Sequence, residues 1–447
     1  MFYNGFENRG YFPNLGENYP FQFQFHSESA GSANGSRQPI PCAASPTGFT
    51  TLESGLTCYT FDPTAVNAAT AGLNLRGIQF NYITPYTLGG NLTLQYQLTP
   101  SMSLQAAYVT TQARHLEVFP GSNNVSEILP QSLSVNDNIK NHIPFPDFAR
   151  GSTQATTNGN SIYHGLQTTV EKRFSGGFNF LATYTWSKSI TDAVDLLNGN
   201  NTGYRGPSIP GFGIHKDYGL SPSDVRNAFH FSGGYELPFG KGKKYMNAGG
   251  VGDKLAGGWS LLWAATLNSG QPRTLGCPSG TTTGTGCNAM LVGDPNSGSH
   301  NVQQFWNPKA FAQPCVLKLT NPADPTSPVI PDVGNPGGCI PLTGTAALGG
   351  GPTQVIGPTF KRLDMSIFKD FQLSERFRLQ FRSEFFNILN HPNFNPPGFG
   401  GNGVISIPGS TNFNNCNSGP CTFGQIGSTR DAPYDPRQIQ FALKLYY

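Results

Sequence analysis

Charged side chains at alternate positions of apolar segments are the first candidates for function. The segment 377–394 reads FRLQFRSEFFNILNHPNF and sets three charges among phenylalanine, leucine and isoleucine residues. From the charged residues of this segment and of the stretch before it, the candidates are Arg362, Asp364, Arg376, Arg378, Arg382 and Glu384. Such residues either line a path for a polar solute or form a solvated ladder of ion pairs across neighbouring strands, and the ladder is more common.

The eight cysteines are the second group with a possible chemistry. They lie in segments rich in Gly, Pro and Ser, as neighbouring pairs: Cys42 with Cys58, Cys277 with Cys287, Cys315 with Cys339, and Cys416 with Cys421. Disulfides between near neighbours in an oxidising compartment explain this pattern best, although the sequence leaves their connectivity open. A zinc site would need tight Cys-x-x-Cys pairs or adjoining histidines, and the sequence has neither.

Catalytic and nucleotide-binding motifs are missing. The sequence contains no G-x-S-x-G, H-E-x-x-H or P-loop motif. FGKGKK at 239–244 lacks P-loop spacing and is better interpreted as a turn between strands, and GDPNSGSH at 293–300 is rich in oxygen ligands without the EF-hand register. We therefore expect neither an enzyme nor a protein with a cofactor or metal.

The composition narrows the class of protein. Charged residues are 12% of the 447, about half the usual share, while aromatic residues are also 12%. Gly and Pro are abundant (55 and 36), which favours many turns over long helices. The net charge of +3 is spread along the chain, so nucleic acid is a poor partner. These features predict an all-β protein.

The candidate charges lie on strands with two different faces. From Arg376 to Leu389, Phe377, Leu379, Phe381, Ser383, Phe385 and Leu389 alternate with Arg376, Arg378, Gln380, Arg382 and Glu384. This period of two indicates a strand, and QLSE at 372–375 joins it to a similar strand before it. The same pattern recurs near 91–108, 166–186, 229–235, 259–267 and 439–447, and with a segment near Phe21 it predicts roughly ten to twelve strands.

The connections between these strands alternate in length. Turns after residues 98, 173 and 371 are short, and the one after 237 is moderate. The long connections lie near 27–87, 112–161, 190–225, 269–360 and 390–435. Short turns at one end and long loops at the other are typical of an antiparallel transmembrane β-barrel of the outer membrane. Its polar face, including the six charged candidates, would then face the lumen, and all eight cysteines would lie on the long-loop side.

A soluble β-sandwich would also give alternating faces. Strand length argues against it, because fourteen residues from Arg376 to Leu389 exceed the usual strand of a globular protein. No apolar run is long enough for a membrane-spanning helix. The N-terminus MFYNGFENRGYF has no secretory leader, so the chain either stays inside the cell or is incomplete.

Several blocks of the sequence resemble the C-terminal barrel of TonB-dependent outer-membrane receptors, in particular the Oar-like group of acidobacteria. The blocks are YHGLQTTVEKRFSGGFNFLATYTWSKSITDA at 163–193, GLSPSDVRNAFHFSGGYELPFGKGKKY at 219–245, FKRLDMSIFKDFQLSERFRLQFRSEFFNILNHPNF at 360–394 and DPRQIQFALKLYY at 435–447. The resemblance implies a larger barrel of about 22 strands with a plug domain, a TonB-contacting segment and a signal peptide. This chain is expected to be the C-terminal part of such a barrel, one region over 1–447 without plug or leader.

The last strand carries the clearest functional signal. Ile439, Phe441, Leu443, Leu445 and Tyr447 place apolar groups at every second position back from an aromatic C-terminus. This resembles the signal that the outer-membrane barrel-assembly machinery recognises, and a free strand edge provides a physical basis for it. The alternative is that this is simply the closing strand.

The leading hypothesis is the barrel of a TonB-dependent receptor in the outer membrane of a Gram-negative type bacterium, with an unknown ligand caught by the long loops. The partners implied are outer-membrane lipid and the barrel-assembly machinery, with the plug and TonB reached only through residues that this chain lacks. The alternatives are a self-contained small pore or adhesin and a secreted two-sheet binding protein.

Overall fold

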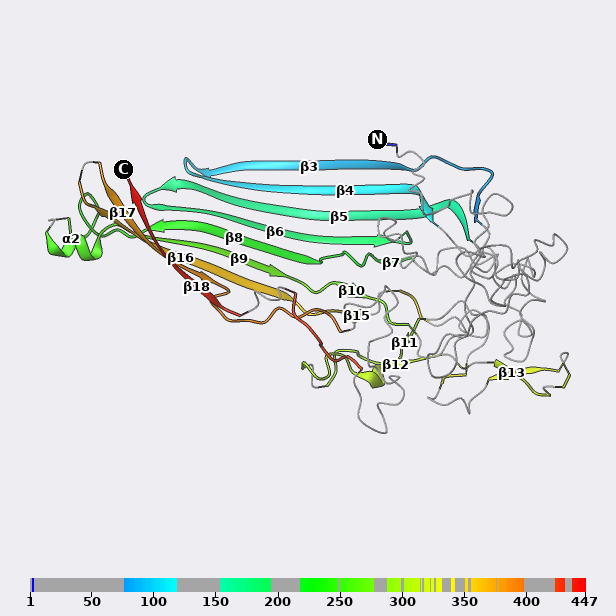
Figure 1. Ribbon diagram of the computed structural model, residues 1–447. Coiled ribbons are helices and arrows are strands. Elements are labelled where there is room, and N and C mark those ends of the chain that lie inside the picture. Colours follow the sequence, from blue (N-terminus) through cyan, green and yellow to red (C-terminus); the bar gives the residue numbers. More distant parts are fainter. Residues whose placement is uncertain are drawn as a thin grey trace, which may run out of the picture.

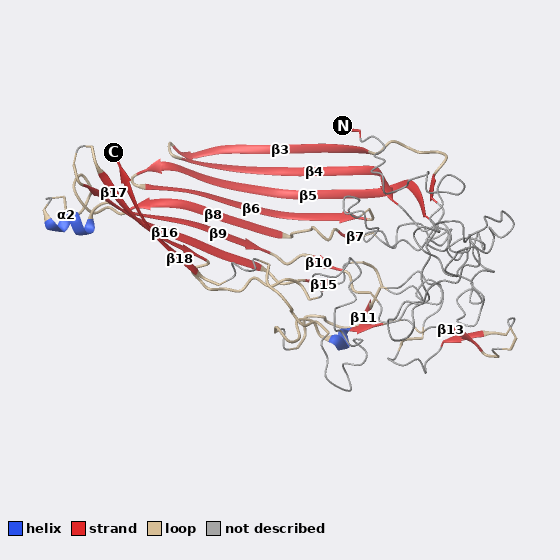
Figure 2. Ribbon diagram, in the orientation of Figure 1, coloured by secondary structure: helices blue, strands red, loops and turns tan. Residues whose placement is uncertain are grey.

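The computed structural model consists almost entirely of strands and loops (Figure 2). It describes residues 2–3, 76–118, 153–193, 218–247, 250–276, 288–298, 301–313, 315, 317–321, 323–324, 327–331, 339–341, 350–352, 355–374, 376–397, 423–430 and 436–447. The predicted strand near Phe21 lies outside these residues.

One large antiparallel sheet dominates the structure (Figure 1). Its long strands are β3 (Tyr86–Thr99), β4 (Met102–Val118), β5 (Thr153–Ser175), β6 (Phe178–Thr191), β8 (Asn227–Glu236), β9 (Trp259–Asn268), β16 (Phe360–Gln372), β17 (Arg378–Phe386) and β18 (Gln438–Tyr446). Three short strands, β1 (Phe2–Tyr3), β2 (Arg76–Ile78) and β7 (Gly219–Leu220), complete its 12 strands. The prediction of an all-β antiparallel architecture is confirmed, with one parallel pair, β2 with β5.

The sheet is an open one among the described residues. Its order is β1-β3-β4-β5-β6-β8-β9-β16-β17-β18, so each long strand pairs with its neighbours in the sequence. β18 lies at one edge, and β3 lies next to the other edge, where β1 covers only Tyr86 and Thr87. The exposed backbone of these edges is able to pair with further strands.

The short turns gather at one end of the sheet (Figure 1). Two residues separate β3 from β4 and β5 from β6, and in the second turn Gly176 and Gly177 have φ values of 66° and 81°. The type I′ and II′ turns that are favoured in two-residue hairpins need such positive φ values, which glycine adopts without strain. At the opposite end β4 runs to Val118 and β5 starts at Thr153, so the strands extend farther than the alternating pattern alone predicts.

The strand predicted over 376–389 is shorter than expected, because β17 covers only nine residues. Asn387 and Asn390 have positive φ values of 49° and 50°, and this left-handed conformation interrupts the extended backbone of a regular strand. The Asn387 side chain accepts the His391 backbone N–H and donates to the His391 carbonyl, so it holds a turn in place of a further stretch of strand. Strand length at this segment therefore does not argue against a soluble sandwich, and that prediction was wrong here. The 23-residue strand β5 is long enough to argue against a sandwich.

The register gives the sheet an apolar face and a polar face. The apolar face carries Leu92, Leu94 and Tyr96 of β3, Phe229 and Phe231 of β8, Trp263 and Leu267 of β9, and Phe441, Leu443 and Leu445 of β18. Many of these side chains are exposed, and within the described part of the chain the only other sheets are small two-stranded ones. An apolar face of this size without a covering sheet does not fit a soluble sandwich.

Aromatic rings cluster on the apolar face towards the short-turn end. Trp263 lies 5.9 Å from Phe178 and 5.6 Å from Phe231, measured between ring centroids. Gly233 makes this possible, because a Cβ there would lie 2.5 Å from a ring carbon of Trp263. Aromatic girdles of this kind mark the membrane interfaces of transmembrane barrels.

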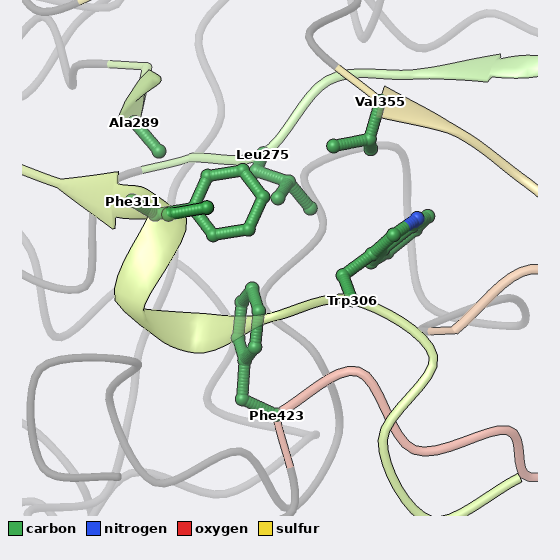
Figure 3. Packing of buried hydrophobic residues seen from close by; sticks show 7 residues of the cluster. Leu275, Ala289, Trp306, Phe311, Val355 and Phe423 are labelled. Carbon is green, nitrogen blue, oxygen red and sulfur yellow. The ribbon is translucent and has the colours of Figure 1, made fainter. Parts of the chain in front are cut away.

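A small hydrophobic core lies among the short elements beyond the long-loop end of the sheet (Figure 1), and Figure 3 shows its packing. It contains Leu275, Ala289, Trp306, Ala310, Phe311, Val355 and Phe423, and the indole N–H of Trp306 donates to the carbonyl of Ile356 at 3.1 Å. The short elements around it are β10 (Pro272–Arg273), β11 (Met290–Leu291), η6 (Pro308–Ala310), β12 (Phe311–Ala312) and β15 (Val355–Ile356). A further hairpin of β13 (Leu317–Leu319) and β14 (Val329–Pro331) lies farther from the large sheet (Figure 1). The connection expected over 269–360 thus includes a packed region.

Candidate functional site

All but one of the predicted lumen charges lie on the polar face of β16 and β17. Antiparallel pairing sets Asp370 opposite Gln380 and Phe368 opposite Arg382 across β16 and β17. On the other side of β17, Arg378 lies opposite Tyr446 of β18. Because directly opposite residues point to the same side of a sheet, these six side chains form one patch, which we call the arginine–tyrosine patch.

Hydrogen bonds connect the arginine–tyrosine patch across three strands. The Nε atom of Arg382 donates to Oε1 of Gln380 at 2.6 Å, and its Nη2 donates to the Tyr446 hydroxyl at 3.3 Å. The Tyr446 hydroxyl donates to the same Gln380 oxygen at 3.3 Å, and the Gln380 amide donates to Asp370 at 3.0 Å. The side chains are therefore held in a fixed arrangement rather than as independent surface charges.

Both arginines of the patch also lie on aromatic rings. The guanidinium of Arg378 is 4.4 Å from the ring centroid of Tyr446, and that of Arg382 is 4.9 Å from the ring of Phe368. Such stacking contributes about 0.5–1 kcal/mol at exposed sites. Stacking covers the faces of the guanidinium groups. Their edges carry the N–H donors and can donate hydrogen bonds to a solute or to another domain.

The remaining predicted charges are placed differently. Arg362 donates from Nε to both carboxylate oxygens of Asp364, at 3.0 and 3.1 Å, and the backbone N–H of Asn387 donates to Asp364 at 2.7 Å. This pair fixes the end of β17 and lies apart from the patch. Arg376 lies in the turn before β17, and Glu384 makes no ion pair or side-chain hydrogen bond with the described residues.

Tyr446 is the residue that the sequence interpretation missed. The interpretation assigned a role only to the apolar positions of the last strand. It assigned none to the other face, which carries Gln438, Gln440, Ala442, Lys444 and Tyr446. The same period of two that marks the apolar residues assigns Tyr446 to the polar face. Its contact with two arginines depends on the register between β17 and β18, which the sequence does not give.

We expect Tyr446→Phe to lower the free energy of unfolding by about 1 kcal/mol, because Arg382 and Gln380 lose their shared hydroxyl partner. The ring under Arg378 remains. Urea-induced unfolding in phospholipid vesicles measures the effect. Tyr447→Phe is the matched control, since Tyr447 is 97% exposed and its hydroxyl has no partner among the described residues, and equal losses in the two variants would contradict the network.

The apolar side of β18 is exposed at the edge of the sheet. Ile439, Phe441, Leu443, Leu445 and Tyr447 are each more than half exposed. Phe441 stacks on Phe381 of β17 with a centroid distance of 6.2 Å. The proposed assembly signal is therefore physically accessible along one edge strand, as binding to another strand requires.

Two ionisable groups outside the long strands, Tyr82 and Arg273, have pKa values shifted by burial. Burial raises the pKa of Tyr82 to about 12, and the negative charge of Glu117 adds to the effect. Burial lowers the pKa of Arg273, and the neighbouring Arg430 lowers it further. Tyr82 stays protonated at neutral pH and arginine stays charged in proteins, so neither group is tuned for acid–base catalysis.

Of the cysteines, Cys315 and Cys339 form a disulfide across 24 residues. Cys42, Cys58, Cys277, Cys287, Cys416 and Cys421 lie outside the described residues. Within the part that is described, no three His, Cys, Asp or Glu side chains gather where they could hold a metal ion. The helices of that part are all too short or too polar to span a membrane.

A family model described as "Outer membrane beta barrel domain" matches residues 1–440. No curated protein matches the sequence.

Solved structures with a similar fold are outer-membrane receptors and transporters. The transporter YddB of Escherichia coli aligns over 84% of this chain with 8% identity and a TM-score of 0.38. The pyoverdine receptor FpvA of Pseudomonas aeruginosa PAO1, solved with pyoverdine bound, aligns over 82% with 9% identity and a TM-score of 0.34. The ferric preacinetobactin receptor BauA of Acinetobacter baumannii aligns over 80% with 8% identity and a TM-score of 0.32. The alignments cover 34%, 30% and 29% of those chains, so this chain spans about a third of their length.

Proposed function

The chain belongs to the outer membrane beta barrel domain family, and we propose that this outer-membrane protein forms part of the wall of a TonB-dependent receptor or transporter. In this proposal the long-loop end captures a ligand outside the cell, and the ligand passes through the barrel of the full-length protein. The plug and the TonB-contacting segment of such a receptor supply the coupling to TonB. The sequence blocks described above carry the resemblance to this receptor group.

One structural observation carries the proposal. The long strands form a single sheet whose apolar face is covered by no other sheet among the described residues and whose other face holds an ordered polar network, with short turns gathered at one end. A transmembrane barrel wall needs this combination, because one face meets lipid and the other meets a wet lumen. The arginine–tyrosine patch would then face the lumen and offer its guanidinium edges to a plug or to a passing solute.

The packed region around Trp306 supports ligand capture at the long-loop end. A loop with its own core keeps binding residues in fixed positions, which lowers the conformational entropy lost when a ligand binds.

A self-contained pore or adhesin is the other candidate, favoured by the ordered polar face, which suits a permanently wet channel. Conductance across planar bilayers separates the two functions. We expect the full-length protein, first shown to fold by heat-modifiable migration in a gel, to give no steady conductance, because a plug fills the lumen. A steady open conductance would overturn the receptor proposal in favour of the pore.

A further inference from the structure

The connection between β8 and β9 is folded into a structure that we call the foot (residues 237–247 and 250–258). It lies at the short-turn end of the sheet and contains the six-residue helix α2 (Val251–Ala256) (Figure 1). The sequence pattern predicts only a turn here. A helix this short is unstable in isolation, so tertiary contacts hold it.

Those contacts come from the apolar face of the sheet. Lys369 of β16 and Trp259 of β9 lie directly opposite each other on this face. The Lys369 ammonium donates to the carbonyls of Leu255 and Gly257, and the Trp259 indole donates to the Leu255 carbonyl at 3.0 Å. A cation at the C-terminal end of α2 donates hydrogen bonds to its last carbonyls and interacts favourably with the helix dipole. The helix is thereby fixed against the face that meets lipid.

Glycine contacts and one carboxylate fix the rest of the foot. Gly240 and Gly257 approach so closely that a Cβ on Gly240 would lie 2.7 Å from the Cα of Gly257. The Asp253 carboxylate accepts the backbone N–H of Lys241 at 2.6 Å, and the Asp253 carbonyl accepts that of Gly257 at 2.7 Å. The foot therefore presents its remaining side chains in a defined direction.

The outer side of α2 is apolar and uncovered. Val251 and Leu255, one turn apart, are 74% and 70% exposed, and Tyr245 and Met246 beside them are also exposed. Residues four apart lie on the same side of a helix. Because α2 is attached to the apolar face of the sheet, this exposed strip continues the lipid-facing surface beyond the strand ends.

The foot is also rich in exposed lysines. The foot and the adjoining Glu236 hold four lysines, Lys241, Lys243, Lys244 and Lys254, against two carboxylates. Glu236 pairs with Lys243 at 2.6 Å, and Asp253 is engaged by the backbone of Lys241. The ammonium groups of Lys241, Lys244 and Lys254 thus have no carboxylate partner among the described residues. An apolar strip together with uncompensated lysines is the pattern of a segment that lies in a membrane interface.

We propose that the foot binds the anionic phospholipid headgroups of the leaflet at the short-turn end, the periplasmic one, with Val251 and Leu255 in the acyl boundary and Lys241, Lys244 and Lys254 on lipid phosphates. The choice of leaflet rests on the proposed function, which sets the long loops outside the cell. The occupant is a lipid surface because the strip is continuous with the lipid-facing wall. Each lysine near such a surface adds electrostatic attraction to the anionic lipids.

Trp259, beside α2, serves as the reporter. The experiment uses a variant of the full chain in which the other three tryptophans are changed to phenylalanine. The variant is folded into phosphatidylcholine vesicles that contain a minor fraction of phosphatidylglycerol. Bromine is placed on one lipid or the other at equal mole fraction. We expect brominated phosphatidylglycerol to quench Trp259 about threefold more strongly, and 0.5 M NaCl to remove the difference.

Lys241→Gln/Lys244→Gln/Lys254→Gln is expected to abolish this preference. The matched control, Lys188→Gln/Lys309→Gln/Lys361→Gln, removes the same charge away from the foot and keeps the preference. Heat-modifiable migration checks that both variants fold, and free phosphate at 10 mM is expected not to displace the lipid. Equal quenching by the two lipids in the unsubstituted background overturns the foot proposal alone. Quenching by neither lipid overturns the membrane placement on which the proposed function depends.

Discussion

Replacing Leu443 by arginine is expected to lower the free energy of unfolding in phospholipid vesicles by about 2–4 kcal/mol. Leu443 lies in the middle part of β18 and is 67% exposed on the apolar face, opposite Phe381 of β17. An arginine there must leave water for the hydrocarbon of the bilayer. Urea titration of the folded protein in vesicles measures the loss, and the amount of heat-modifiable protein in the outer-membrane fraction is expected to fall with it.

Gln440→Arg is the matched control, because it sets the same charge on the same strand but on the polar face. Gln440 lies directly opposite Glu384, which has no ion-pair partner among the described residues. The new arginine can form a cross-strand ion pair with Glu384. The free energy of unfolding of this variant should therefore stay within about 1 kcal/mol of that of the unsubstituted protein. If Gln440→Arg proved as harmful as Leu443→Arg, the assignment of one face to lipid and the other to the lumen would be wrong.

The same pair of variants tests the assembly signal. If the barrel-assembly machinery recognises the apolar positions of β18, Leu443→Arg should reduce insertion in cells more than its loss of stability in vesicles explains. A variant that is destabilised in vesicles but inserts normally would reduce β18 to an ordinary edge strand.

Trp306→Ala is expected to remove about 3–5 kcal/mol from the stability of the loop region while the sheet stays folded. Trp306 is 0% exposed at the centre of the small core, and its indole N–H bonds to Ile356 (Figure 3). The cavity would undo the packing between Leu275, Val355 and Phe423. Limited proteolysis from the loop side should cut the variant in the segment 270–313, and heat-modifiable migration should persist.

Two further variants sharpen this result. Trp306→Phe keeps most of the packing and loses only the hydrogen bond, so about 1–2 kcal/mol is expected. Val302→Ala, at an exposed position of the same region, should change stability by less than about 0.5 kcal/mol. Loss of heat-modifiable migration in Trp306→Ala would show that the loop core and the sheet form one cooperative unit.

Local patterns in the sequence determined the strands and their faces. A period of two, with two-residue turns between β3 and β4 and between β5 and β6, specifies antiparallel hairpins without any distant contact. The same period assigns Leu443 and Arg382 to opposite faces before any partner strand is known. This is why the all-β architecture and the outer-membrane family were both expected from the sequence.

Only the tertiary structure decided the features that depend on residues far apart in the chain. Helix α2 exists because Lys369 caps it across a separation of 114 residues, and the six-residue helix has no periodic signal of its own. Tyr446 meets Arg382 across 64 residues through the register of two strands, and Asp364 holds the end of β17 through Asn387 across 23. The loop core joins Trp306 to Leu275 and Phe423. A strand is a local arrangement of alternating side chains, whereas a cap, a network or a core is a contact that forms only after the chain has brought its distant parts together.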